Sequence, residues 1–294
     1  MEKIAPALLD WFYRNRRSLP FRDDPTPYHI WVSEIMLQQT RVAAALPYYE
    51  RFIRELPDIP ALAACPPERL DKLWEGLGYY RRVHSMQKAA QQVCRQYGGH
   101  LPASYDALLA LPGIGPYTAG AIASIGFGLA APAVDGNVLR VFARLYNDSG
   151  PITDPAVKKR FTQRVMEHQP PDAPGDYNQA LMELGALVCL PGGAPLCAQC
   201  PLAALCEGRK AGAAEALPCK AAPKPRRVLP VTVALVQNAA TGEWLLQKRP
   251  EGGLLAGLWQ PPAFEGRQLD GPAVRQALSA LVDQVAGAVL YYDG

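Results

Sequence analysis

Apolar positions recur at helical spacing through most of residues 1–215. From Ile30 to Ile53 they lie three and four residues apart, and a second apolar stripe runs from Val138 to Leu145. Ser104 stands where a helix N-cap is expected, and Pro116 where a helix opens on its first turn. The pattern predicts a mostly α-helical body.

The pattern changes after residue 215. A proline-rich, basic stretch without apolar periodicity predicts a linker over 216–228. Two apolar runs flank the turn-like AATG and predict a strand–turn–strand unit over 229–250, followed by a helix over 272–287 and a strand over 288–292. Because 66 residues form a marginal domain and a last strand leaves an unpaired edge, we expect the α+β tail, 229–294, to be truncated.

Composition excludes several classes of protein. With 49% hydrophobic and 19% charged residues the chain is globular rather than disordered, and it has no apolar run of 18 residues that would predict a membrane span. The first residues lack the apolar core of a signal peptide, so we expect a cytoplasmic protein. Residues 1–227 hold 26 basic against 21 acidic side chains, whereas 228–294 hold 4 against 6, which suggests two bodies with different roles.

Four of the seven cysteines lie close together near the end of the helical part. Their spacing is C-x7-C-x2-C-x5-C, and four thiolates so placed can surround either a zinc ion or an iron–sulfur cluster. An odd total of cysteines in a cytoplasmic chain disfavours disulfides. One leading cysteine followed by three in a tight loop favours the cluster over zinc. The four ligand candidates are Cys189, Cys197, Cys200 and Cys206.

The segment LPGIGPYTAG, 111–120, joins two predicted helices through Gly113 and Gly115. Glycines allow tight turns and a close approach to a ligand, and the free amides of the second helix can hold a phosphate. This is the pattern of a helix-hairpin-helix, which grips the DNA backbone without reading sequence. The alternative is a simple glycine-rich turn.

Two acidic residues are candidates for acid–base chemistry. Glu34 has mostly apolar neighbours three and four residues away, which should raise its pKa and suit a general acid. Asp135 precedes a helix, where amide hydrogen bonds favour the ionised form. One neutral and one charged carboxyl is the arrangement used to cleave sugar bonds. The plain alternatives are a glutamate at the edge of the core and an aspartate that only caps its helix.

In these segments the chain resembles the MutY adenine DNA glycosylases, a family of the helix-hairpin-helix glycosylases. The stretches SEIMLQQT and GLGYYRR are its most specific motifs, and the resemblance covers nearly all of residues 1–206 in order. The segment 253–262, GLLAGLWQPP, also looks like the family's Nudix-like C-terminal domain. The matching stretches are 19–22, 27–42, 74–82, 111–122, 133–141, 178–189 and the cysteine segment.

The resemblance implies a two-lobed glycosylase domain over 1–215. One lobe would be the helical bundle 26–134 with the hairpin, and the other would combine 1–25 with 135–215 around one 4Fe-4S cluster. An incomplete Nudix-like domain would follow the linker, over 229–294. The implied partner is double-stranded DNA with adenine opposite 8-oxoguanine or guanine, bound by a monomer, with no membrane association.

The resemblance also implies roles for single residues. Glu34 would protonate adenine at N7 after the base is flipped out, and would later activate water. Asp135 would stabilise the oxocarbenium ion or bond to the sugar carbon, with Tyr117 and Asn137 assisting. Leu37 and Gln179 match positions that contact the flipped adenine, and Gln39 and Tyr79 match positions that wedge into the base stack. The remaining DNA-binding candidates are Arg22, Gln38, Gly113 and Gly115.

Position 117 separates this family from its endonuclease III-like relatives, and three further features depart from the family pattern. Position 117 is tyrosine, whereas endonuclease III-like enzymes carry there the lysine that forms a Schiff base, so we expect a monofunctional glycosylase. The cysteine loop 190–196 is one residue longer than usual, so we expect it to bulge with its ligands unchanged, and it lacks Lys and Arg. The family segment that recognises 8-oxoguanine lies beyond residue 294, so we expect weak discrimination between opposing 8-oxoguanine and guanine.

Three other functions remain to be weighed. A Nudix hydrolase needs a glutamate-rich REx2EE run to hold magnesium, which the residues after Pro261 lack. A non-catalytic DNA-binding protein would predict substitutions at positions 34 and 135, and both acids are present. An endonuclease III-like enzyme for oxidised pyrimidines is disfavoured by Tyr117.

Overall fold

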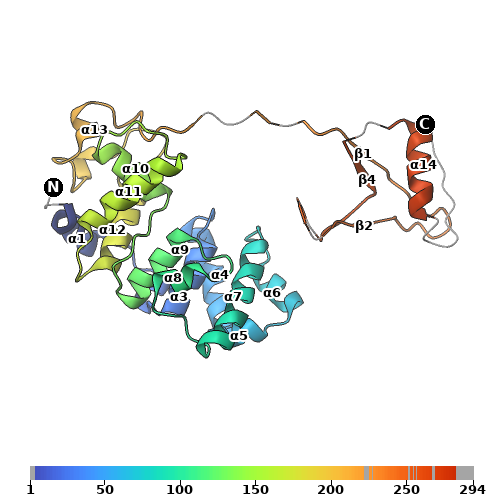
Figure 1. The fold of residues 1–294 in the computed structure, drawn as a ribbon, viewed down its shortest axis with the longest axis horizontal. Coiled ribbons are helices and arrows are strands. Elements are labelled where there is room, and N and C mark those ends of the chain that lie inside the picture. Colours follow the sequence, from blue (N-terminus) through green and yellow to red (C-terminus); the bar gives the residue numbers. More distant parts are fainter. Residues whose placement is uncertain are drawn as a thin grey trace. The chain divides into compact units, whose positions relative to one another are not determined.

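The computed structural model divides the chain into two compact units, residues 1–222 and 223–294 (Figure 1). Within the described residues, no helix combines the length and apolar character needed to cross a bilayer. The structure describes residues 4–221, 225–226, 228–250, 252–253, 255, 257–266 and 269–282.

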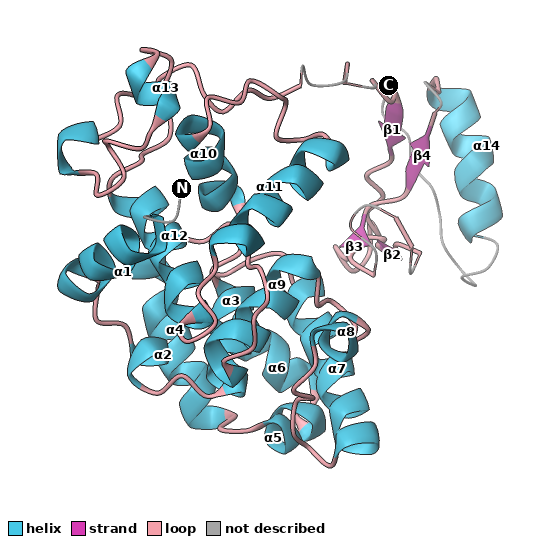
Figure 2. Ribbon diagram, turned by 60° about the vertical axis from the view of Figure 1, so that its left-hand side comes forward, coloured by secondary structure: helices cyan, strands magenta, loops and turns pink. Residues whose placement is uncertain are grey.

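The first unit is helical, and no strand is assigned within residues 4–221 (Figure 2). Besides α-helices it contains a π-helical segment, η1, and a short 3-10 helix, η2. In chain order the elements are α1 (Ile4–Asn15), α2 (Pro20–Asp23), α3 (Pro27–Met36), α4 (Val42–Glu55), α5 (Ile59–Ala64), α6 (Pro67–Trp74), α7 (Arg81–Tyr97), α8 (Tyr105–Leu109), α9 (Pro116–Ala121), η1 (Ile122–Gly126), α10 (Gly136–Leu145), α11 (Pro155–His168), α12 (Pro174–Leu187), η2 (Cys197–Gln199) and α13 (Glu207–Lys210).

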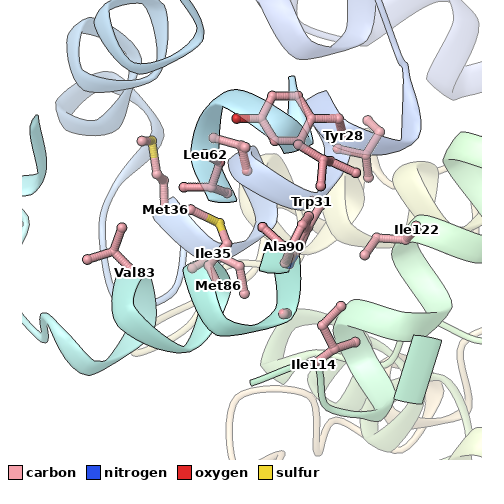
Figure 3. Packing of buried hydrophobic residues seen from close by; sticks show 14 of the residues in the cluster. Tyr28, Trp31, Ile35, Met36, Leu62, Val83, Met86, Ala90, Ile114 and Ile122 are labelled. Carbon is pink, nitrogen blue, oxygen red and sulfur yellow. The ribbon is translucent and has the colours of Figure 1, made fainter. Parts of the chain in front are cut away.

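One hydrophobic core lies among helices α2 to α9 and η1, with α3 at its centre. Figure 3 shows Trp31 and Ile35 of α3 beside Leu62 of α5 and Met86 and Ala90 of α7. Trp31 is fully buried, so its truncation to alanine would cost about 3–5 kcal/mol of folding free energy. Because α3 is buried from residue 30 to its end, a glutamate on this helix is placed in apolar surroundings.

A second core joins the start of the chain to its later helices. Ile4, Leu8 and Phe12 recur every four residues along α1, and this face packs against α12. Helices α10 and α11 complete the cluster through side chains such as Phe142 and Phe161. The chain therefore begins in one lobe, builds the other, and returns to the first at α10.

The two lobes meet at Asn178 of α12, which is fully buried. Its side-chain amide donates to Ser124 Oγ and to the Ala131 carbonyl, both at 2.8 Å, and its Oδ1 accepts from the Ala133 amide at 3.3 Å. Every polar atom of this side chain is thus satisfied, so the contact fixes α12 against η1 without an unpaired buried group.

The predicted helix caps are confirmed, and one predicted helix is modified. Ser104 Oγ accepts the Ala107 amide, and Pro116 opens α9. The helix expected to run through 116–125 instead widens into η1 from residue 122. Within this stretch the Ser124 hydroxyl donates to the Gly120 carbonyl at 2.7 Å, an alternative to regular backbone pairing that periodicity alone does not reveal.

The first unit extends past the change in composition at residue 215. The Leu217 carbonyl accepts from Arg144 Nε at 2.9 Å, and the Cys219 carbonyl accepts from the Ile152 amide at 3.0 Å. Part of the stretch that we expected to be a linker over 216–228 therefore lies against the helical unit.

The described residues of the second unit form two antiparallel strand pairs and one helix. Strand β1 pairs with β4, with Thr232 opposite Phe264, and β2 pairs with β3, with Lys248 opposite Trp259. The elements are β1 (Val231–Val233), β2 (Gln247–Lys248), β3 (Trp259–Gln260), β4 (Ala263–Glu265) and α14 (Gly271–Val282).

The predicted strand–turn–strand unit forms only around its turn. The Asn238 amide donates to the Glu243 carbonyl, and the Leu245 amide to the Val236 carbonyl. Beyond this turn both strands take other partners, which a local pattern does not specify. The strand expected over 288–292 lies outside the described residues.

Candidate active site

A cleft lies between α3 and α9 of one lobe and α10 and α12 of the other. Glu34 and Asp135 both line it, so the two candidate acids share one cavity although 101 residues separate them along the chain. The other predicted site residues that line it are Arg22, Leu37, Gln38, Gln39, Tyr117, Asn137 and Gln179.

Glu34 is 8% exposed, in the last turns of α3. Burial, the largest influence, raises the pKa of its carboxyl to about 7, and the negative charge of Asp135 acts in the same direction. Hydrogen bonding to Tyr117 and the positive charge of Arg22 oppose the shift. Near neutral pH the carboxyl is therefore poised between its neutral and ionised forms.

Tyr117, at the start of α9, donates its hydroxyl hydrogen to Glu34 Oε2. The same hydroxyl oxygen lies 3.2 Å from Met182 Sδ. Burial and the negative charges of both acids raise the Tyr117 pKa well above its usual value. The phenol consequently stays protonated and acts as a fixed hydrogen-bond donor.

Asp135 is the N-cap of α10 and has both carboxylate oxygens engaged. Oδ1 accepts the Val138 amide at 2.8 Å, and Oδ2 accepts the Asn137 side-chain amide at 2.6 Å. Burial is the larger influence and raises the Asp135 pKa, while these hydrogen bonds and the charge of Arg140 lower it. Arg140 in turn donates to Asn137 Oδ1 at 2.8 Å, which fixes the direction of the Asn137 amide.

A buried ion-pair network forms another wall of the cleft. Glu183 of α12 is 1% exposed and accepts from Arg17 Nε at 2.7 Å and from Arg22 Nη2 at 2.9 Å. Although burial raises its pKa, these hydrogen bonds lower it to about 2. Arg22 also donates to Gln179 Oε1 at 3.0 Å. The oxygen of the Gln179 amide is thus used as an acceptor, and its amide hydrogens can donate to a ligand in the cleft.

Sequence reasoning missed Glu183 and Arg17, which both line the cleft. One signal was available for the first, because Glu183 is the single charged residue in the apolar run 180–188, ALMELGALV. Such a carboxylate must find a partner when it is buried. Nothing local identifies Arg17 as that partner, since 166 residues separate the two.

The predicted wedge residues border a second cavity. Gln38 and Gln39 line both cavities. Tyr79 also lines the second cavity and is 66% exposed. The segment that follows α3 therefore lines both cavities.

The hairpin glycines have different roles. Gly113 lines the second cavity with φ +77°, and an added Cβ would lie 2.6 Å from Ser85 Cβ, so both conformation and space require glycine here. Gly115 caps α9 with φ −93° and has open space where a Cβ would point. Its environment leaves room for a ligand but does not itself require glycine.

The four clustered cysteines line a separate pocket. Arg144 is 3% exposed, and its Nη1 donates to Cys189 Sγ at 3.2 Å, while its carbonyl accepts from Cys206 Sγ at 3.3 Å. A buried guanidinium beside sulfur fits thiolate ligands, which carry negative charge. Burial and the neighbouring thiols raise the Cys200 pKa to about 11, and a bound cation would favour the thiolate form.

Within the part of the chain that the structure describes, no three His, Cys, Asp or Glu side chains approach closely enough to hold a single metal ion. The four cysteines therefore line one pocket without forming a single-ion site. Their loop closes through a hydrogen bond from the Leu196 amide to the Val188 carbonyl at 2.9 Å.

Comparisons with known proteins agree with this arrangement. Residues 32–167 match the family model described as HhH-GPD superfamily base excision DNA repair protein. An adenine DNA glycosylase from Homo sapiens is 37% identical over 92% of this chain, and the chain spans 60% of that protein. An adenine DNA glycosylase from Schizosaccharomyces pombe is 30% identical over 92% of this chain and 71% of its own length.

A solved structure of endonuclease III trapped in a covalent intermediate with DNA superposes with a TM-score of 0.60. It is 25% identical and covers 72% of this chain and 98% of its own. The helical unit thus has the glycosylase fold of that superfamily. From the shared fold, and from similarity that extends along the chain to relatives of one kind, the protein belongs to the adenine DNA glycosylase family.

Proposed function

We propose that the protein is a monofunctional DNA glycosylase that hydrolyses the N-glycosidic bond of adenine mispaired with 8-oxoguanine or guanine. The observation that carries the proposal is the pairing of Glu34 and Asp135 in one cleft, with the pKa of Glu34 near 7. The names of its relatives support adenine as the base.

The two acids have different tasks in this reaction. Glu34 in its neutral form protonates N7 of the extruded adenine, and the C1′–N9 bond then breaks with its electron pair leaving on the base. Asp135 in its ionised form stabilises the positive charge on the deoxyribose. Glu34, now ionised, takes a proton from water as the water oxygen bonds to C1′, which restores the neutral acid.

The surrounding residues hold these groups in their working states. The Tyr117 hydroxyl orients the Glu34 carboxyl, and Asn137 orients Asp135. Gln179, fixed by Arg22, presents its amide hydrogens to acceptors on the base. Because tyrosine has no amine, it cannot form the imine of a strand-cutting lyase, so the product is an abasic site.

The cysteine pocket supports one 4Fe-4S cluster held by Cys189, Cys197, Cys200 and Cys206. Four cysteines that line one pocket, with the buried Arg144 guanidinium donating to Cys189 Sγ, fit the negative charge that such a cluster's thiolate ligands would carry. The cluster would supply a rigid, electron-rich centre that ties α12 to α13. No step of base removal uses it.

The second unit is proposed as part of a Nudix-like domain. Its antiparallel pairs and α14 support an α+β fold.

The test is excision of adenine from a duplex with one A·8-oxoguanine pair, followed by alkali to cut abasic sites. Native protein should cut the adenine strand, and Glu34→Gln should lose at least about 100-fold in single-turnover rate. Glu68→Gln, an exposed position on α6, is the matched control and should match the native protein. Release of oxidised pyrimidines without adenine, or robust borohydride trapping on DNA, would instead support an endonuclease III-like enzyme.

A further inference from the structure

Two exposed residues beside the second cavity have an unusual backbone conformation. Gln39, just after α3, has φ +61°, and Tyr79, just before α7, has φ +47°. Side-chain-bearing residues adopt positive φ at a cost, and such strain persists only where neighbouring groups impose it. The two residues lie in different loops, yet they border the same cavity.

One guanidinium reaches both loops. Arg82 Nη1 donates to the carbonyls of Ile35 and Gln38, each at 2.7 Å. Arg82 Nη2 donates to the carbonyls of Leu77 at 3.1 Å and Gly78 at 3.2 Å.

The same guanidinium also stacks. Its central carbon lies 5.2 Å from the centre of the Trp74 ring and 5.8 Å from that of Tyr79. All of its hydrogen-bond acceptors in the described part of the chain are backbone carbonyls.

These contacts act on the peptide bonds that precede the two strained residues. The Gln38 carbonyl belongs to the peptide joined to Gln39, and the Gly78 carbonyl to the peptide joined to Tyr79. Because φ is the rotation between that peptide and the residue's own Cα, fixing the carbonyl direction restricts φ. The bonds to the Ile35 and Met36 carbonyls also satisfy acceptors in the last turn of α3.

We infer that Arg82 is a positioning residue that holds Gln39 and Tyr79 at a fixed separation, so that both side chains enter the DNA base stack together. The inference rests on the proposed function, in which these two residues act as wedges. Lysine cannot replace Arg82, because one ammonium on a flexible stem lacks the planar fork that reaches two loops at once.

The first test needs neither DNA nor activity. Amide hydrogen exchange in peptides covering 36–41 and 77–81 is compared between native protein, Arg82→Lys and Arg95→Lys, an exposed control on the same helix. Arg82→Lys should raise exchange at least tenfold in both segments, and Arg95→Lys in neither. A rise in one segment only, or in none, overturns the inference.

The second test separates positioning from general destabilisation. With enzyme in saturating excess, Arg82→Lys should lower the single-turnover rate of adenine release at least tenfold on a paired duplex. On a duplex with an abasic analogue opposite the adenine, less unstacking is needed, and the loss should fall below threefold. Equal losses on both substrates would mean a merely structural role.

A third test places Arg82→Lys in a background that lacks both wedge side chains. In a Gln39→Ala, Tyr79→Ala background, Arg82→Lys should change the rate less than threefold, because the residues through which it acts are gone. If Arg82→Lys lowers the rate as much in this background as in the native protein, the inference is wrong. Native protein that releases no adenine from any duplex refutes the proposed function instead, and the exchange experiment still reports on Arg82.

Discussion

The Tyr117 hydroxyl donates its hydrogen to a carboxylate oxygen of Glu34 and so joins the first turn of α9 to the last turns of α3. Burial raises the pKa of Glu34, and this hydrogen bond lowers it; the result is about 7. The pKa of Glu34 therefore depends on the Tyr117 phenol, which stays protonated because its own pKa is raised well above its usual value.

Substitution of Tyr117 by phenylalanine should therefore raise the Glu34 pKa further. The alkaline limb of the single-turnover pH–rate profile should move up by roughly half to one pH unit, with less than tenfold change in the maximal rate. Excision rates from pH 6 to 9.5 measure this shift. A downward movement of the limb would contradict the assigned direction of the hydrogen bond.

The native enzyme should itself lose activity as pH rises through about 7. Glu34 must be protonated to act on adenine, and the fraction that is neutral falls tenfold per pH unit above its pKa. Single-turnover rates should follow that slope between pH 7.5 and 9. A profile that stays flat over this range would remove Glu34 from the protonation step.

Glu34→Gln should make the protein more stable at alkaline pH while it abolishes activity. The folded-state pKa of Glu34 is raised, so ionisation above pH 7 places an unfavourable charge in the core, whereas glutamine remains neutral. Unfolding in urea at pH 8.5 should show a gain on the order of 2 kcal/mol. The gain should vanish below pH 4.5, where the native carboxyl is neutral in both states.

Glu183, which two arginines hold ionised, should have the opposite effect on how folding stability depends on pH. Its pKa is lowered to about 2, so its contribution to stability is present above pH 4.5 and is lost as pH falls toward 2. Glu183→Gln leaves Arg17 and Arg22 without their counter-charge and should cost on the order of 3 kcal/mol at pH 7. Urea unfolding at pH 7 and pH 3 measures this, and the difference in stability between native protein and Glu183→Gln should be smaller at pH 3.

The cysteine pocket leads to a prediction about metal content. Purified native protein should contain about four irons and four acid-labile sulfides per chain. Arg144→Gln removes the buried donor to Cys189 Sγ and should lower both contents in parallel, while Arg95→Lys leaves them unchanged. One zinc per chain with no sulfide would identify a single-ion centre instead.

The sequence singled out the two candidate acids but not the groups that hold them. Glu34 and Asp135 each combine an acidic side chain with a recognisable helix position, and only their occurrence together with the hairpin and the four cysteines favoured a catalytic role over a structural one. Their shared cleft could not be derived from spacing, because it depends on how α3 and α10 pack. Arg82 shows the same limit, since its carbonyl partners carry no side-chain signature.

Irregular backbone conformations and long-range strand pairing also could not be predicted from the sequence. The π-helical segment that begins at Ile122 continues an unbroken helical pattern, and the pairing of β1 with β4 joins strands 30 residues apart. In both cases tertiary contacts decide between conformations that periodicity leaves equivalent. The positive φ of Gln39 is similar, because glutamine itself gives no preference for that conformation.

The buried amide of Asn178 has a consequence for how substrate enters. With all its hydrogen bonds made between the lobes, opening them would expose a network that water must then repair. In the proposed reaction the cleft would then be assembled before DNA binds, and the duplex would supply the movement. A base pair that opens easily would reach Glu34 and Asp135 more often, so weak pairing would contribute to the choice of a mismatch.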